Sequence, residues 1–174
     1  MVALEVGLSA TRVAGLVAYS VSLALCASRC LRGRRINGLY GILSLLQLVL
    51  LLDIVFDWRW MLHELLLQNA MAHGVYGARR PGQLLWLCIL MGFVAAGVVL
   101  VTVKLQSRRG AAIAVIGTIL SVGLRCMEVV SYHWVDAVMY FRVGAVMLVG
   151  ILWIALGLFT SLGVWMNGRL RQPR

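Results

Sequence analysis

The sequence is poor in charged residues, and acidic residues are the scarcest. Charged residues are 13% of 174, with 6 Asp and Glu against 16 Lys and Arg, and 62% of the chain is hydrophobic. An ordinary soluble domain has roughly 25% charged and about 45–50% apolar residues. The composition therefore excludes that class and predicts an integral membrane protein.

Several other features are missing. At about 20 residues per span, the length leaves no room for a soluble catalytic domain beside five spans, and no linker or internal repeat is evident. We therefore expect a single domain, residues 1–174. The cations lie between long apolar runs, which is the arrangement that orients membrane spans. The positive charge therefore does not indicate a nucleic-acid partner. The four cysteines form no C-x-x-C motif, and we expect buried structural thiols.

Long apolar runs predict the fold class, an all-α integral membrane bundle of five transmembrane helices. The first run contains Arg12 and has no basic leader, so we expect a retained helix rather than a cleaved signal. The connection between the second and third spans is long, and a helix is expected in it to about His73. The predicted spans are Gly7–Ser28, Ile36–Phe56, Leu84–Leu105, Ala111–Ser131 and Val138–Met166.

The distribution of cations predicts the orientation of the bundle. Ten of the sixteen follow the first, third and fifth spans, in RCLRGRR, KLQSRR and GRLRQPR. The positive-inside rule places these segments in the cytoplasm, with the N-terminus outside and the C-terminus inside. The connection between spans two and three is then extracytoplasmic, and the expected location is the bacterial cytoplasmic (inner) membrane.

The remaining ionisable residues fall in the predicted outer half. This half holds all six acids, all three histidines and the other six arginines, so its formal charge is zero. Such compensation is expected where charges pair with one another near lipid. Polar residues thin out toward the cytoplasmic half.

The fourth span carries the clearest polar pattern. Thr118, Ser121, Arg125, Glu128 and Tyr132 share one helical stripe, and an ionisable residue inside a span is a functional candidate by default. The alternative is an interhelical salt bridge that fixes packing.

In the fifth span Gly150, Gly157 and Ser161 form a smooth stripe for a close helix neighbour, either in this chain or in another subunit.

A second polar group follows in SYHWVD, at the expected short turn into the fifth span. Ser131, His133 and Asp136 do not indicate a catalytic triad, because no strained nucleophile turn such as G-x-S-x-G is present. We expect His133 and Asp136 to orient one another and close the outer end of the bundle, with Arg142 just inside the fifth span.

Acidic and histidine residues near the second span are candidate metal ligands. If that span continues as a helix, Asp53, Asp57, Glu64 and Gln68 share one stripe. Pairing with Arg12, Arg125 and Arg142 is favoured over Mg²⁺. His63, His73 and His133 supply enough ligands for Zn, Cu or haem iron, but their spacing fixes no site, so the cofactors stay unknown.

The last candidate is GVYGARRPGQ, in which Tyr76 precedes Arg79, Arg80 and Gln83. Paired arginines bind phosphate or carboxylate through bidentate hydrogen bonds, so an anionic lipid headgroup or an acidic partner loop is the expected ligand, against ordinary interface anchoring.

This G-x-Y-x-x-R-R-x-x-Q string and the S-x-H-x-x-D pattern resemble a pattern in small uncharacterised bacterial polytopic membrane proteins. The resemblance implies no activity. It implies that one set of residues acts together, namely Tyr76, Arg79, Arg80, Gln83, Arg125, His133 and Asp136.

These observations favour a non-catalytic integral subunit or accessory protein of a larger membrane complex. Its outer polar cluster, including Glu128 and Arg142, would bind a partner protein, a lipid headgroup or a quinone-like ligand. The expected partners are membrane lipids and other membrane subunits or further copies of the chain. One alternative is an intramembrane enzyme or a redox or metal-binding protein that uses His63, His133, Glu64 and Glu128 for proton transfer or metal ligation. The other is a small oligomeric transporter.

Overall fold

The protein is nearly all helical, with five helices long and apolar enough to cross a membrane. The computed structural model describes residues 9–32, 37–74, 79–130 and 133–169, and the side chains of 37, 70, 79, 133, 168 and 169 lie outside that description. The five spanning helices are α1 (Ala10–Arg32), α2 (Asn37–Phe56), α4 (Arg79–Lys104), α5 (Arg109–Val130) and α7 (Leu148–Arg169). The expected helical membrane class is confirmed.

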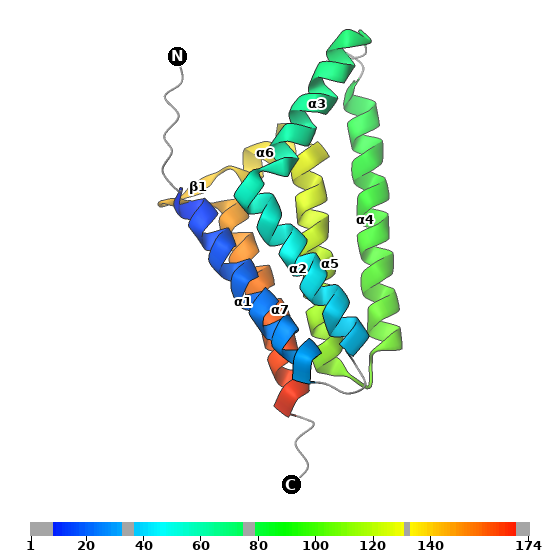
Figure 1. Ribbon diagram of the computed structural model, residues 1–174. Coiled ribbons are helices and arrows are strands. Elements are labelled where there is room, and N and C mark those ends of the chain that lie inside the picture. The colour runs from blue at the N-terminus through cyan, green and yellow to red at the C-terminus, as the bar shows by residue number, and fades with distance from the viewer. Residues whose placement is uncertain (1–8, 33–36, 75–78, 131–132, 170–174) are drawn as a thin grey trace.

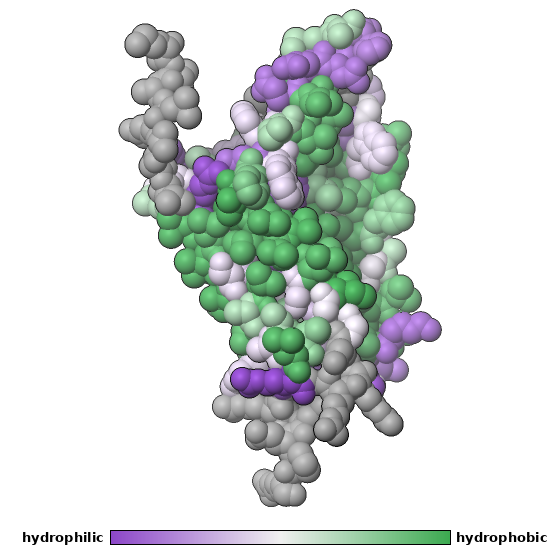
Figure 2. Space-filling view, in the orientation of Figure 1, coloured by the Kyte–Doolittle hydropathy of each residue, from purple (hydrophilic) through white to green (hydrophobic). Residues whose placement is uncertain are grey.

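Three short elements lie at the end of the bundle where α1, α4 and α7 begin (Figure 1). They are helix α3 (Trp58–Ala72), helix α6 (His133–Met139) and a hairpin of β1 (Arg142–Val143) and β2 (Val146–Met147). We call this the outer end, after the predicted orientation. Figure 2 shows apolar residues around the middle of the visible face and hydrophilic residues toward its two ends.

The expected start of the fifth span is wrong by ten residues. Helix α7 begins at Leu148 rather than Val138, because the chain first makes α6 and the hairpin. Residues 144 and 145 form the hairpin loop, and Gly144 has a φ of +66°, which glycine adopts without steric cost. The expected short turn is therefore a segment of about 15 residues that covers the outer end.

Helices α1, α2, α5 and α7 form the core of the bundle (Figure 1). The stripe of small residues on α7 faces α1 of the same chain. A Cβ added at Gly157 would lie 2.9 Å from Ala18 Cβ, and the Ser22 hydroxyl reaches Gly157 O at 2.9 Å and Ser161 Oγ at 3.2 Å. This answers the question that the sequence left open, because the close neighbour is an intramolecular helix.

Helix α4 stands apart from this core and packs mainly on α5 (Figure 1). In its most apolar 18-residue window no residue is buried, whereas 28–44% are buried in the corresponding windows of the other four spans. Cys88 on α4 is exposed, so the expectation of buried thiols is wrong for this cysteine. Helix α4 therefore presents most of its circumference to lipid or to another protein.

Candidate functional site

The site begins at a bend between α2 and α3. Asp57 joins the two helices in the left-handed conformation, with φ 53° and ψ 38°. Asp and Asn adopt this conformation more readily than most residues. The Asp53 carboxylate accepts a hydrogen bond from Arg59 N at 3.0 Å, and so satisfies a free amide in the first turn of α3. The bend breaks the expected acidic stripe, leaving Glu64 exposed on α3.

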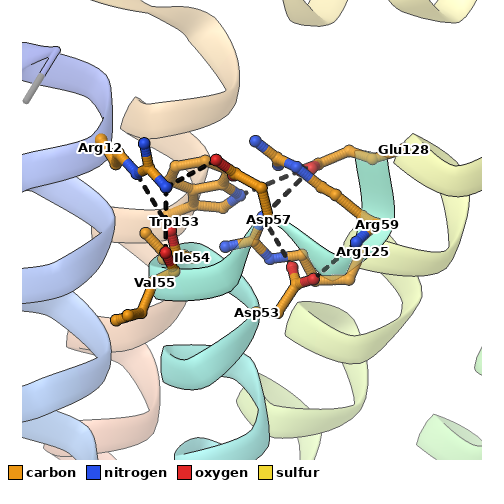
Figure 3. Close-up of polar contacts among 9 residues, drawn as sticks. All are labelled: Arg12, Asp53, Ile54, Val55, Asp57, Arg59, Arg125, Glu128 and Trp153. Atoms are coloured by element: carbon orange, nitrogen blue, oxygen red, sulfur yellow. Dashed lines mark hydrogen bonds and ion pairs between the residues drawn. The ribbon is translucent and has the colours of Figure 1, made fainter. Parts of the chain in front are cut away.

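Arg12 of α1 binds the outer end of α2 (Figure 3). Its Nε donates to Ile54 O at 3.1 Å, and its Nη2 donates to Val55 O at 3.1 Å and to Asp57 Oδ2 at 2.6 Å. The last carbonyls of a helix have no partner within the helix and carry partial negative charge. A single guanidinium therefore satisfies the end of α2 and neutralises Asp57.

Glu128 of α5 is the centre of the site (Figure 3). Its side chain is 1% exposed and accepts from three donors: Arg59 Nη1, Arg125 Nη1 at 3.2 Å, and Trp153 Nε1 at 3.1 Å. A buried carboxylate is costly unless it is paired and hydrogen-bonded. Helices α3, α5 and α7 are joined by this one side chain.

Arg125 occupies the space between α2, α5 and α7. Its side chain is 7% exposed and forms ion pairs with Glu128 and, at 3.4 Å, with Asp53. Its guanidinium carbon lies 4.0 Å from the Trp153 ring centroid and 5.7 Å from that of Tyr19, within the range of cation–π attraction. These contacts compensate a charge that would cost about 3 kcal/mol alone inside a span.

We define the charge network as three arginines and three acids, which together are formally neutral: Arg12, Asp53, Asp57, Arg59, Arg125 and Glu128. The sequence identifies Arg125 and Glu128 through their stripe, and suggests Asp53 and Asp57 as partners for Arg12 and Arg125. It does not identify Arg59 or Trp153. Arg12 and Asp53 could also have been identified as members, because each is a charged residue within a long apolar run.

A cavity of about 420 Å³ lies beside the charge network. We call it the outer cavity, and its polar and aromatic walls come from Arg12, Asp57, Arg59, Tyr140 and Trp153. Partial burial, reinforced by the negative charge of Glu128, raises the pKa of the Tyr140 phenol, so its hydroxyl stays protonated at neutral pH. The cavity thus offers guanidinium, carboxylate and phenol groups at the level where the spans end.

The other predicted site residues whose side chains the structure describes lie on α4, α6 and β1. Arg142 is exposed on β1, Arg80 is exposed near the start of α4, and Asp136 is half-buried on α6. Gln83 donates to Val130 O at 3.2 Å and so ties α4 to the end of α5. Tyr76 lies outside the described residues, as do the side chains of Arg79 and His133. Their proposed joint action stays a prediction.

Gln83 also lines a second, mainly apolar groove of about 520 Å³ between α3, α4 and α5. His63 and Trp86 border it as well. His63 stacks on Trp60, whereas His73 contacts Asn69 O at the end of α3. In the described part of the chain, no three residues among His, Cys, Asp and Glu come close enough together to hold a metal ion.

Uncharged polar residues continue from the charge network into the inner half of the bundle. Gln47 donates to Thr118 at 3.1 Å, and Ser22, Ser161 and Asn167 are also buried. Buried uncharged polar residues are therefore present in both halves of the bundle, whereas the ion pairs of the charge network lie at its outer end. The helices close tightly around this part, since a Cβ at Gly110 of α5 would lie 2.5 Å from the Asn167 backbone. This packing does not favour a solute path along the α5–α7 seam.

The chain matches no family model, no curated protein and no solved structure.

Proposed function

We propose that the chain is a non-catalytic integral subunit or accessory protein of a larger complex in the bacterial inner membrane. In this proposal α4 contacts a spanning helix of a partner subunit, and the outer cavity beside the charge network binds a membrane component at the end of the bundle. The N-terminus lies outside and the C-terminus in the cytoplasm.

The observation that carries the proposal is the exposure of α4. Cys88, Gly92 and Ala96 are one helical turn apart and all exposed, and nothing lies within 4 Å of a Cβ placed at Gly92. Small residues at this spacing allow two membrane helices to approach closely. No residue of the apolar window of α4 is buried within the chain, so its small-residue face is available to a partner.

The charge network supports a structural and binding role. The three acids are paired with arginines, and Glu128 has all three of its donors in place. A buried carboxylate whose charge is paired and whose acceptors are occupied holds α3, α5 and α7 together, which suits a structural role. The outer cavity remains open to a ligand beside these fixed charges.

Cross-linking through the native Cys88 tests the proposal. A variant that retains only Cys88 is treated in membranes with a short bis-maleimide, and the products are separated by mass and identified by mass spectrometry. We expect an adduct larger than the 19.1 kDa chain, containing either a different membrane protein or a second copy. A variant that retains only Cys126, which is half-buried on α5, is the control and should give little adduct.

Gly92→Leu supplies a second measure, because the added side chain would occupy the open face of α4. We expect it to reduce the Cys88 adduct while leaving the thermal stability of the chain unchanged. A purified chain that is monomeric and gives no Cys88 adduct in native membranes would contradict the proposal.

A further inference from the structure

We infer that the outer cavity binds a zwitterionic phosphoethanolamine headgroup, with the phosphate on the guanidinium groups and the ammonium on Asp57. The inference rests on the proposed function, and it specifies which membrane component the outer cavity binds.

The charge balance of the cavity favours a zwitterion over an anion. Arg12 and Asp57 form one ion pair on its wall, and Arg59 pairs with Glu128 behind it. Both pairs are neutral, so a ligand with net charge would bring an uncompensated charge to a partly desolvated site. A ligand that carries one charge of each sign adds none.

Unused donors provide a place for the phosphate. Within the described residues, the Nη1 of Arg12 and the Nη2 of Arg59 have no hydrogen-bond partner. Guanidinium groups bind phosphate oxygens through directional, charge-assisted hydrogen bonds. The Tyr140 hydroxyl on the same cavity wall can add a neutral donor.

Asp57 and Trp60 provide a place for the ammonium. The Asp57 side chain is 41% exposed although it is paired with Arg12, so its carboxylate can accept a further hydrogen bond. Trp60 lines the cavity with an exposed ring, and aromatic faces attract ammonium groups. A primary ammonium has three N–H donors, whereas the quaternary ammonium of phosphocholine has none, so the carboxylate should distinguish the two headgroups.

The position of the cavity indicates a lipid as the carrier of this headgroup. Its lining includes Thr11 and Arg12 at the start of α1, Ile54 near the end of α2 and Val149 at the start of α7. These are the ends of spanning helices, which lie at headgroup level. Trp58 and Trp60 at the start of α3 are exposed, and tryptophan is enriched at the membrane interface.

Native mass spectrometry of the full chain tests the inference. The chain is reconstituted with equal amounts of phosphatidylethanolamine, phosphatidylcholine and phosphatidylglycerol, and the lipids retained on the protein are counted. We expect phosphatidylethanolamine to be retained about tenfold over the other two, equivalent to about 1.4 kcal/mol. Equal retention of phosphatidylcholine, or a preference for phosphatidylglycerol, would overturn the inference.

Asp57→Asn isolates the carboxylate, because Asn also tolerates the left-handed conformation. We expect the preference for phosphatidylethanolamine over phosphatidylcholine to fall to about twofold or less. Glu64→Gln removes an exposed carboxylate from α3 outside the cavity and should keep the tenfold preference. An unchanged preference in Asp57→Asn would overturn the inference.

Soluble headgroups test the wild-type chain without any variant. Glycerophosphoethanolamine should displace the retained phosphatidylethanolamine or raise the melting temperature in phosphatidylcholine nanodiscs, whereas glycerophosphocholine should do neither. If only the diacyl lipid binds selectively, the acyl chains contribute and a lipid is the source; if the soluble compound binds as well, the headgroup alone is sufficient. If both soluble compounds bind and displace the lipid or raise the melting temperature to the same extent, the inference is overturned. Cross-linking at Cys88 does not depend on this cavity, so failure here is distinguishable from failure of the proposed partner contact.

Discussion

The charge network predicts that Glu128→Gln strongly destabilises the bundle although it barely changes the shape of the side chain. The amide oxygen can still accept from Trp153 Nε1, but the ion pairs with Arg59 and Arg125 are lost. The formal charge of the network changes from zero to +1. The excess positive charge then lies beside a side chain that is only 1% exposed.

The expected magnitude follows from the burial of the partners. Removing one member of a buried pair costs about 3–5 kcal/mol, because the other charge is left uncompensated. At about 2–4 °C per kcal/mol for a chain of this size, a loss of about 3 kcal/mol lowers the apparent melting temperature by roughly 6–12 °C. Glu64→Gln, on the exposed face of α3, should change stability by less than about 0.5 kcal/mol.

Thermal unfolding in nanodiscs, followed by intrinsic tryptophan fluorescence, measures both variants. The double variant Arg125→Met/Glu128→Gln should recover part of the loss, because it removes the unpaired guanidinium together with its partner. A melting temperature for Glu128→Gln within 1 °C of wild type, or a double variant that shows only the sum of the two single losses, would refute a stabilising role for the paired charges.

Four further predictions test other parts of the structure. Gly157→Ala should cost about 1–3 kcal/mol in the same unfolding assay, because its Cβ would meet Ala18, whereas Gly92→Ala, with nothing within 4 Å, should be neutral. Asp57→Ala should be less stable than Asp57→Gly by about 1 kcal/mol, because both lose the carboxylate but only alanine is strained at positive φ; equal melting temperatures would show that the bend relaxes. Arg125→Ala should lower stability and complex yield, whereas Arg108→Ala, which removes an exposed side chain, should not; equal losses in the two variants would contradict this. In a cysteine-free background, a membrane-impermeant maleimide applied to intact cells should label Met71→Cys on α3 and not Ser107→Cys; the opposite pattern would reverse the predicted orientation.

The spanning helices could be predicted from the sequence because each is a long apolar run bounded by polar or basic residues. The Arg125–Glu128 pair could also be predicted, since two residues three apart on a helix are neighbours. The start of α7 could not, because residues 138–147 are as apolar as a span. The glycine in the loop R-V-G-A-V-M is the available signal for a hairpin, and it is weak beside that hydrophobicity.

The contact between Arg59 on α3 and Glu128 on α5 depends on one backbone conformation that the sequence does not show. If α2 continued past Asp57 as a regular helix, the direction of α3 would change and Arg59 would not be in its observed position beside Glu128. Asp57 can adopt the left-handed conformation, but aspartate is also common in ordinary helices and loops. Arg59 reaches a carboxylate 69 residues away only because the chain bends at this position.

The same bend accounts for the location of the outer cavity. It directs α3 away from the axis of α2, as Figure 1 shows, and it brings Asp57 to Arg12 and Arg59 to Glu128. In each pair the carboxylate therefore holds the arginine in place, and the arginine keeps a guanidinium nitrogen that can donate to a ligand. A regular helix through residues 53–64 would place its acids on a single stripe, where like charges repel one another, and it would move Arg59 away from Glu128. The left-handed residue thus places Asp57 beside Arg12 and Arg59 beside Glu128, and the binding properties proposed for the outer cavity depend on these two neutral pairs.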